Sequence, residues 1–311
     1  MKIISIVIPT YNEEENVELL YQKIRDIFIK DLIKYEYEYI FIDNASEDST
    51  VQTLKSIARR DKNVKIIVNS RNFGHTRSPL YGLLEAKGDA VIAMAADFQD
   101  PPNVIPSLVK EWENGYHSVL AIKVDSEEKK SMWKIRELYY ELLSLLSEIK
   151  LFKNFYGFGL YDRKVVVALK DMNDVNPFFR GMISEVGFDI TQVEFSQPAR
   201  ARGITKHNFY TLYDMAMLGI VNNSRIPLRI ATFMAIFIGI ISFCIGIFYF
   251  LAKIIYWDSM SLGVAPLIIG VAFTFSILLF FMGIIGEYIG VIYIQVLKRP
   301  LVFEKERINF D

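Results

Sequence analysis

Two long segments without a charged residue, 230–252 and 265–286, lie near the C-terminal end of this 311-residue chain. Each exceeds the roughly 20 residues that an α-helix needs to cross a hydrocarbon core of about 30 Å. The connector between them, 253–264, is too short to form a domain. We therefore expect a transmembrane hairpin. Two buried helices of a large soluble domain are a less favoured alternative, because core helices seldom carry two such segments in succession.

Basic residues beside these segments predict how the hairpin is oriented. Arg225 and Arg229 precede the first segment, Lys298 and Arg299 follow the second, and the connector contributes only Lys253. An excess of Lys and Arg marks the cytoplasmic side of a membrane protein. We expect an integral protein of the inner membrane, with the N-terminus and the C-terminus both cytoplasmic.

The charge balance bears on the partners of the chain. A net charge of −1 disfavours nucleic acid as a partner. Between residues 198 and 229, however, five basic residues stand against one acid, Asp214. Such a segment beside a membrane favours anionic headgroups or a phosphorylated lipid. The single cysteine, Cys244, lies in the first apolar segment, which excludes disulfides and cysteine-based metal sites.

Before residue 199 the chain alternates short apolar runs with amphipathic stretches, which predicts an α/β fold with a mostly parallel sheet. The expected strands are 3–8, 39–42, 64–68, 90–95 and 119–122. The expected helices begin at the capping-box-like pairs Asn12–Glu15 and Ser49–Gln52, and cover 79–86 and 103–113. Two further amphipathic stretches, 129–149 and 209–220, fit either a protein core or helices that guide a lipid tail.

Polar clusters follow the first four expected strands, where ligands bind in open α/β sheets. The clusters are Tyr11-Asn12-Glu13, Asp43-Asn44, Ser70-Arg71-Asn72 and Asp97-Phe98-Gln99-Asp100. No glycine-rich phosphate loop of the Walker or dinucleotide type accompanies them. A kinase, an ATPase and a dehydrogenase are therefore disfavoured.

Several motifs along the chain are similar to those of one enzyme family. They are Pro9-Thr10-Tyr11-Asn12-Glu13, Asp43-Asn44-Ala45-Ser46, Arg71-Asn72-Phe73-Gly74, Asp97-Phe98-Gln99-Asp100-Pro101-Pro102, Phe179-Arg180-Gly181 and Pro227-Leu228-Arg229. In this order, and followed by a membrane hairpin, they resemble the family-2 glycosyltransferases. Within that family the chain resembles the polyisoprenyl-phosphate branch, which holds dolichol-phosphate mannose synthases and bactoprenol glucosyltransferases.

The resemblance implies a Rossmann-like domain of the glycosyltransferase A type and a C-terminal two-helix transmembrane hairpin. The implied divisions are a cytoplasmic domain 1–198, a basic loop and juxtamembrane helix 199–229, transmembrane helices 230–252 and 265–286 around an extracytoplasmic connector 253–264, and a cytoplasmic tail 287–311. The implied substrates are a nucleotide-diphosphate sugar and a polyprenyl phosphate held in the membrane lipid. Assembly into a homo-oligomer stays open.

The resemblance also implies the roles of individual residues. Nucleotide-sugar binding falls to Pro9, Tyr11, Glu13, Asp43, Arg71, Ala95, Ala96 and Asp97. Asp97 and Gln99 would hold Mg²⁺ or Mn²⁺, and such a cation stabilises the charge that develops on a departing diphosphate. Arg200 and Lys206 would bind phosphate and, with Asp97, form the catalytic set.

The chain departs from the family pattern at four positions. The family usually has aspartate where this chain has Asn44 and Ala95, and many relatives have aspartate and arginine at Gly157 and Gly159. The aspartate at the position of Gly157 has been considered a catalytic base. A phosphate acceptor is already mostly dianionic at neutral pH and needs little proton abstraction. The departures leave open an altered donor specificity or a loss of activity.

We therefore expect inverting transfer of a sugar from a nucleotide diphosphate to a polyprenyl phosphate at the cytoplasmic face. Three alternatives stay open at this point. A processive synthase would show a Gln-x-x-Arg-Trp motif and more spans, which this chain lacks. A transferase with an alcohol acceptor would need a base, and the candidate position holds Gly157. A catalytically silent subunit that binds lipid or nucleotide sugar is the third.

Overall fold

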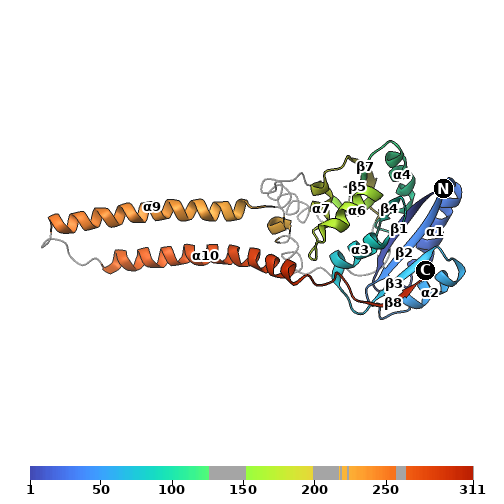
Figure 1. The fold of residues 1–311 in the computed structure, drawn as a ribbon, viewed down its shortest axis with the longest axis horizontal. Helices are drawn as coiled ribbons and strands as arrows, with labels where there is room; N and C mark the ends of the chain where they lie inside the picture. Colours follow the sequence, from blue (N-terminus) through green and yellow to red (C-terminus); the bar gives the residue numbers. More distant parts are fainter. Residues whose placement is uncertain (126–151, 199–216, 218, 223, 257–263, 311) are drawn as a thin grey trace.

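The computed structural model describes residues 1–125, 152–198, 217, 219–222, 224–256 and 264–310. It has an α/β body, from one side of which a long helical hairpin projects (Figure 1). Several predictions lie outside the described residues. These are the helix 129–149, the basic segment with Arg200 and Lys206, most of the stretch 209–220, and residues 257–263 of the connector.

A mixed sheet forms the centre of the body, and its eight described strands follow the order β7-β5-β6-β4-β1-β2-β3-β8. The strands are β1 (Lys2–Thr10), β2 (Tyr35–Asp43), β3 (Val64–Asn69), β4 (Ala90–Ala93), β5 (Ser118–Asp125), β6 (Phe155–Asp162), β7 (Ile190–Ser196) and β8 (Glu304–Ile308). β1 pairs in parallel with β2 and β4, β2 with β3, and β5 with β7. β6 and β8 run antiparallel to their neighbours. The predicted α/β fold with a mostly parallel sheet is confirmed.

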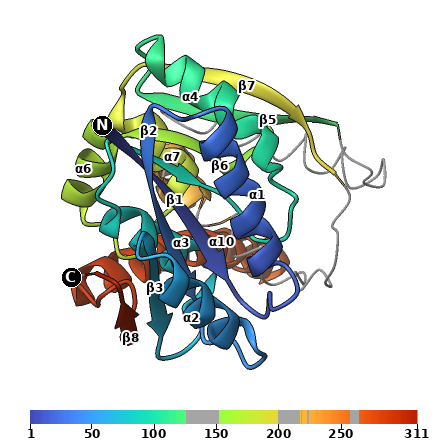
Figure 2. The same cartoon turned by 90° about the vertical axis from the view of Figure 1, so that its right-hand side faces the viewer.

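Helices cover both faces of the sheet. One face carries α1 (Val17–Lys30), α2 (Thr50–Arg60) and α4 (Ile105–Glu113), and the other carries α3 (Gly74–Glu85), α6 (Arg163–Met172) and α7 (Phe179–Val186). Along β1, Ile6 and Ile8 pack into the first apolar cluster and Val7 into the second, because successive side chains of a strand point to opposite faces. Figure 2 looks onto the α1 side, with α10 behind the sheet.

Two predicted helix starts are wrong. Asn12 does not cap a helix, because its backbone is left-handed (φ 58°) and α1 begins only at Val17. α3 begins at Gly74 and contains Pro79, at which the sequence had predicted a start. Pro79 lies inside α3 rather than at its start, and because proline lacks a backbone N–H it removes one helical hydrogen bond there. The longer α3 brings its first turn next to the polar loop that follows β3.

The hairpin consists of α9 (Ile226–Ile255) and α10 (Val264–Leu297), which run side by side (Figure 1). Each contains a segment long and apolar enough to cross a bilayer, Ile226–Phe248 and Phe273–Leu297, with mean hydropathies of 2.5 and 2.2. Neither segment is buried in the protein. Large side chains such as Phe243 on α9 and Phe280 on α10 are exposed. Both helices extend beyond the predicted spans, and a core-helix interpretation does not fit them.

The end of the chain does not form the tail predicted for 287–311. α10 continues to Leu297, and β8 then pairs antiparallel with β3 at the edge of the sheet. Ion pairs fix β8 to the helices beside it, with Lys55 Nζ 2.6 Å from Glu306 and Arg307 Nη2 2.7 Å from Glu85. The sequence Glu-Lys-Glu-Arg-Ile lacks the apolar alternation that predicts a strand. The C-terminal strand therefore belongs to the same body as β1.

Candidate active site

The carboxyl ends of β1 and β4 form the edge of the sheet where the strand order reverses, with β2 and β3 on one side of β1 and β4 on the other. Ligands of open α/β sheets bind at such a switch point. Tyr11 follows β1, Asp43 ends β2, Arg71 follows β3, and Asp97 follows β4. The topology therefore brings these predicted site residues to one edge, which we call the switch-point edge.

Asp43 lies inside this edge rather than on its surface. Its side chain has no exposed area. Its Oδ2 accepts hydrogen bonds from Thr10 Oγ1 at 3.2 Å and Ser46 Oγ at 2.5 Å, and its Oδ1 accepts one from the Ser46 backbone N–H at 2.9 Å. Asp43 thus fastens the end of β1 to the loop after β2. Sequence reasoning missed Thr10 and Ser46, although both lie in quoted motifs.

The loop after β1 is held by the loop after β2. Ser46 Oγ accepts a hydrogen bond from the Asn12 backbone N–H at 2.9 Å, and Asn12 Oδ1 accepts one from the Glu47 N–H at 2.9 Å. The backbone N–H of Glu13 donates to Thr50 Oγ1 at 2.8 Å, and its carboxylate accepts from Asn16 Nδ2 at 2.6 Å. Tyr11 and Glu13 are therefore carried on a braced loop rather than on a free one.

Asn44 explains one departure from the family pattern. Its Nδ2 donates to Asn72 Oδ1 at 3.0 Å and to the Gly74 carbonyl at 3.1 Å. Its Oδ1 accepts from the Phe73 backbone N–H at 2.8 Å and from Asn69 Nδ2 at 3.2 Å. The side chain is 7% exposed. An amide is needed here because it donates and accepts at once, and a carboxylate cannot donate.

The segment 95–100 forms a tight loop around Asp97, which is 5% exposed. Asp97 Oδ1 accepts from the Gln99 backbone N–H at 3.2 Å, and Asp100 Oδ2 accepts from the Ala95 N–H at 2.7 Å. Phe98 between them has a left-handed backbone (φ 61°). Burial, together with the charge of Asp97, raises the pKa of Asp100 to about 7 although the Ala95 hydrogen bond lowers it.

Arg71 is exposed, and its guanidinium lies 4.1 Å from the centre of the Phe73 ring. Its Nη1 donates to the Asn72 carbonyl at 3.0 Å. Of the other predicted nucleotide residues, Pro9 pairs with Ile42 within the sheet and Ala96 is buried. Their contacts with a nucleotide stay predictions.

The two glycines of β6 differ in whether a side chain would fit at their positions. A Cβ at Gly159 would lie 2.5 Å from the Val119 carbonyl oxygen of β5, so no side chain fits there. Gly157 has a left-handed backbone (φ 108°), and a Cβ there would lie 3.6 Å from the Phe179 ring. Glycine at 159 is therefore required by close strand packing, whereas position 157 has room but a conformation that favours glycine.

Two cations lie around the ring of Tyr156 on β6. Tyr156 precedes Gly157, and its ring centre is 5.9 Å from Lys123 Nζ and 5.1 Å from the Arg180 guanidinium. Lys123, near the end of β5, is only 4% exposed. Sequence reasoning quoted Arg180 within a motif but missed Lys123, for which an isolated lysine in an apolar strand was the available signal.

The family model described as "Glycosyl transferase family 2" matches residues 5–169. The chain belongs to glycosyl transferase family 2. The family predicted from the motifs is thus confirmed. Over 298 residues the chain is 35% identical to the SfII prophage-derived bactoprenol glucosyl transferase of Shigella flexneri, covering 96% of each chain. It is 34% identical to the bactoprenol glucosyl transferase of Shigella phage SfX, covering 98% of this chain and 99% of that one.

Solved structures with a similar fold have low sequence identity. One is mannosyl-3-phosphoglycerate synthase from Rubrobacter xylanophilus, 15% identical, with 70% of this chain and 71% of that chain covered and a TM-score of 0.48. Another is S. aureus TarS 1-349, 19% identical, with 72% and 66% covered and a TM-score of 0.46.

The side chains available as metal ligands limit how this family-2 glycosyltransferase could hold a metal ion. Among the described residues no group of three or more His, Cys, Asp or Glu side chains is placed to bind one. Asp97 is a buried carboxylate at the switch-point edge, and the other buried one, Asp43, is held by hydrogen bonds from Thr10 and Ser46. Mg²⁺ is commonly bound by one or two carboxylates together with substrate phosphates. The residues therefore fit a cation shared with a diphosphate, but not one held by the protein alone.

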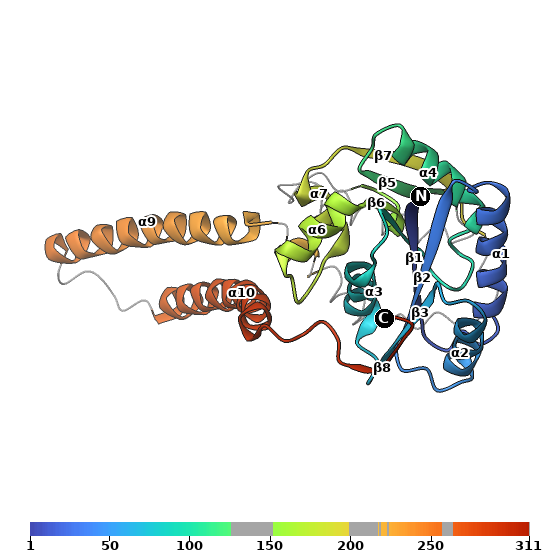
Figure 3. The same ribbon diagram turned by 45° about the vertical axis from the view of Figure 1, so that its right-hand side comes forward.

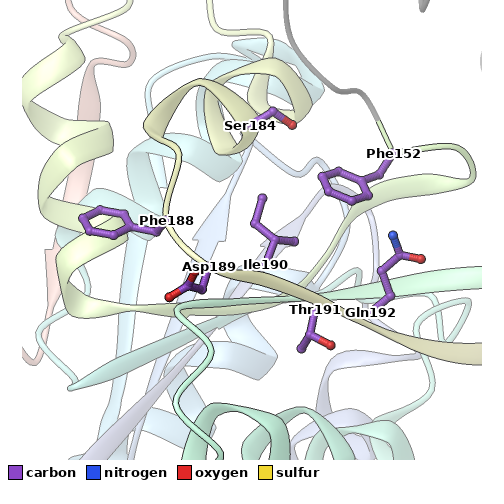
Figure 4. A pocket seen from close by; sticks show the side chains of 7 residues that line it. All are labelled: Phe152, Ser184, Phe188, Asp189, Ile190, Thr191 and Gln192. Carbon is purple, nitrogen blue, oxygen red and sulfur yellow. The ribbon is translucent and has the colours of Figure 1, made fainter.

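Two hollows in this glycosyltransferase are lined by none of the predicted residues of the switch-point edge. One of about 550 Å³ lies at the start of β7, between Ser184 of α7, Phe152 and Gln192 (Figure 4). Another of about 290 Å³ lies near Trp112, His117 and the start of β1. The second is at the amino ends of β1 and β2, opposite the edge where Asp97 lies.

Proposed function

We propose that this glycosyltransferase moves a sugar from a nucleotide-diphosphate donor to a polyprenyl phosphate at the cytoplasmic face of the membrane. The observation that carries the proposal is the placement of Asp97 at the switch-point edge of a family-2 domain whose chain continues into two apolar helices. The names of the relatives support a bactoprenol acceptor, because they match over nearly the whole chain.

The donor site falls on the loops gathered at the switch-point edge. Tyr11 and Glu13 on the braced loop, Arg71 after β3, and Ala95 and Ala96 after β4 would line the nucleotide-sugar pocket, with Pro9 and Asp43 beneath them. Asp97 and Gln99 would hold Mg²⁺ or Mn²⁺. When bound, such a cation lowers the energy of the negative charge on the leaving nucleoside diphosphate.

The acceptor phosphate is the attacking group. One of its oxygens forms a bond to the anomeric carbon while the bond from that carbon to the diphosphate breaks, and displacement from the opposite side inverts the configuration. No residue needs to remove a proton, because a phosphate monoester is mostly dianionic at neutral pH. Lys123 and Arg180, the two cations around the Tyr156 ring, support an anionic acceptor better than an alcohol. Arg200 and Lys206 would contribute further phosphate contacts.

The placement of the hairpin supports a cytoplasmic orientation for both termini. α9 starts and α10 ends on the side of the body, where Tyr288 Oη donates to the Ser224 carbonyl at 2.6 Å. β8 then returns the chain to the sheet that contains β1. The domain and both chain ends therefore lie on one side of the two apolar segments, and the flanking Arg225, Arg229 and Arg299 support a cytoplasmic location for that side.

A donor screen tests the proposal. Full-length protein is purified in detergent and given undecaprenyl phosphate, Mn²⁺ and one radiolabelled nucleotide sugar at a time, and label is followed into the organic phase. We expect one donor to yield labelled glycolipid only when both lipid phosphate and divalent cation are present. Release of free labelled sugar without labelled glycolipid would indicate hydrolysis of the donor. Failure with every donor and cation would instead favour a silent binding subunit.

A further inference from the structure

Three arginines from distant parts of the chain meet where α10 joins the body. Arg71 lies in the loop after β3, Arg77 in the first turns of α3, and Arg299 two residues beyond the end of α10. Arg77 Nη2 donates to the carbonyl of Pro300 at 2.9 Å, which fixes the two segments to each other. Figure 3 shows that the chain runs past α3 on its way from α10 to β8.

The segment that carries Arg299 is held firmly against the loop that carries Arg71. The Ser70 backbone N–H donates to the Phe303 carbonyl at 2.8 Å. The rings of Phe73 and Phe303 have their centres 6.2 Å apart, and Val302, which precedes Phe303 in the chain, is buried. The arginines are therefore placed by the fold rather than by chance contacts of long side chains.

The positive charge of this cluster has no ion-pair partner among the residues that the structure describes. Within the described part of the chain, no carboxylate forms an ion pair with Arg71, Arg77 or Arg299. The first turn of α3 contains no acidic residue. The N-terminus of this helix adds partial positive charge of its own. Burial, followed by the charges of Arg71 and Arg299, lowers the pKa of Arg77. The arrangement therefore opposes the charge on Arg77 instead of stabilising it.

One N–H group in the cluster also lacks a hydrogen-bond acceptor among the described residues. Arg77 Nε is buried and has no hydrogen-bond partner in the described structure. A buried donor without a partner is rare in native proteins, because its desolvation is not compensated. An anion that accepts from guanidinium groups would supply both the missing acceptor and the missing charge.

The position of the cluster indicates which anion is available. The apolar segment of α10 ends at Leu297, and Lys298 and Arg299 follow at once. Basic clusters directly cytoplasmic to a membrane helix bind the phosphates of anionic lipids. We propose that Arg71, Arg77 and Arg299 bind the phosphate of an anionic phospholipid headgroup and so anchor the loop after β3 to the membrane surface. Arg71 also borders the proposed donor pocket, whereas Arg77 on α3 and Arg299 after α10 have no role in the proposed donor or acceptor sites.

Native mass spectrometry of the full-length protein in detergent tests this site. Phosphatidylglycerol and phosphatidylcholine with identical acyl chains are added in parallel, and the retained lipid is counted. We expect wild type to retain phosphatidylglycerol at a concentration about ten-fold lower than phosphatidylcholine. Arg299→Gln and Arg77→Gln should each remove that preference. Arg299 has an exposed side chain, so its substitution tests the site even if Arg77→Gln disturbs the contact with Pro300.

Lys305→Gln is the matched control, since Lys305 is an exposed cation on β8 and its loss changes the net charge equally. It should keep the wild-type preference. Inorganic pyrophosphate in place of lipid distinguishes a soluble phosphate from a headgroup. Unchanged phosphatidylglycerol retention in both arginine variants overturns the proposal. It is also overturned if pyrophosphate binding, but not lipid retention, depends on Arg77 and Arg299, because the cluster would then serve the donor.

Discussion

The backbone N–H of Ala95 donates to the carboxylate of Asp100 at 2.7 Å, and this bond closes the loop on which Asp97 is carried. Asp100→Ala leaves that N–H without its acceptor, at a cost of about 1 to 3 kcal/mol. We expect the loop to loosen, and the Mn²⁺ concentration that gives half-maximal transfer to rise at least about five-fold. Asp100→Asn keeps an acceptor oxygen and should change it less. An unaltered Mn²⁺ dependence in Asp100→Ala would show that the bond does not position Asp97.

Asp97 itself is expected to be indispensable. Asp97→Ala removes the carboxylate that we propose shares a cation with the diphosphate, so transfer of label to polyprenyl phosphate should fall to background. Insertion into membranes should be unaffected, because the substitution lies far along the chain from α9 and α10. Radiolabel transfer and membrane flotation measure the two properties separately. Substantial transfer by the variant would contradict the metal role.

Asn44 tests whether a departure from the family pattern is structural. Asn44→Asp places a carboxylate against two acceptors, Asn72 Oδ1 and the Gly74 carbonyl, which now receive hydrogen bonds. We expect the free energy of unfolding to fall by about 1 to 3 kcal/mol, the cost of leaving buried polar groups unpaired. Thermal unfolding in detergent measures this change. Asn63→Asp is the control, because Asn63 is exposed in a turn. Equal stability of the two variants would argue against the structural role of Asn44.

The sequence predicted the switch-point edge well because strand ends and polar clusters are local features. Tyr11, Asp43, Arg71 and Asp97 each follow or end an apolar run, and a parallel sheet then brings them together. What lies beneath this edge could not be predicted, since the inward direction of Asp43 depends on Thr10 and Ser46, which belong to different segments.

The C-terminal strand was missed for a different reason. β8 is an edge strand rich in charged residues, and its pairing is fixed by Lys55 and Glu85 on other elements rather than by its own apolar pattern. Similarly, the need for glycine at 159 comes from the carbonyl of Val119 on the neighbouring strand. Contacts between distant segments of this kind leave no signal in the spacing of one sequence.

Gly159 gives a prediction that depends on this close approach. Gly159→Ala places a Cβ 2.5 Å from the Val119 carbonyl oxygen, so β5 and β6 must move apart. Overpacking of this kind typically costs about 1 to 3 kcal/mol, which should lower the midpoint of thermal unfolding. Gly239→Ala on α9 is the control, because no atom lies within 4 Å of a Cβ there. A Gly159→Ala midpoint equal to that of the control would mean that β5 yields without cost.

Glu38 predicts how stability depends on pH. Burial raises the pKa of its carboxyl, but hydrogen bonds from Lys65, Ser5 and the Lys87 backbone outweigh burial and hold that pKa below its usual value. A carboxyl with a lowered pKa in the folded state stabilises the protein above its unfolded pKa of about 4.3, and this contribution is lost as pH falls through the lower folded value.

Glu38→Gln should therefore destabilise the protein at pH 7, where the ion pair with Lys65 at 2.5 Å is fully formed. Below pH 4 the difference between variant and wild type should shrink, because wild-type Glu38 becomes protonated there. Denaturant unfolding at both pH values measures it, and Glu36→Gln on an exposed position of the same strand controls for the loss of charge. A difference between Glu38→Gln and wild type that stays constant from pH 7 to pH 3 would contradict the lowered pKa.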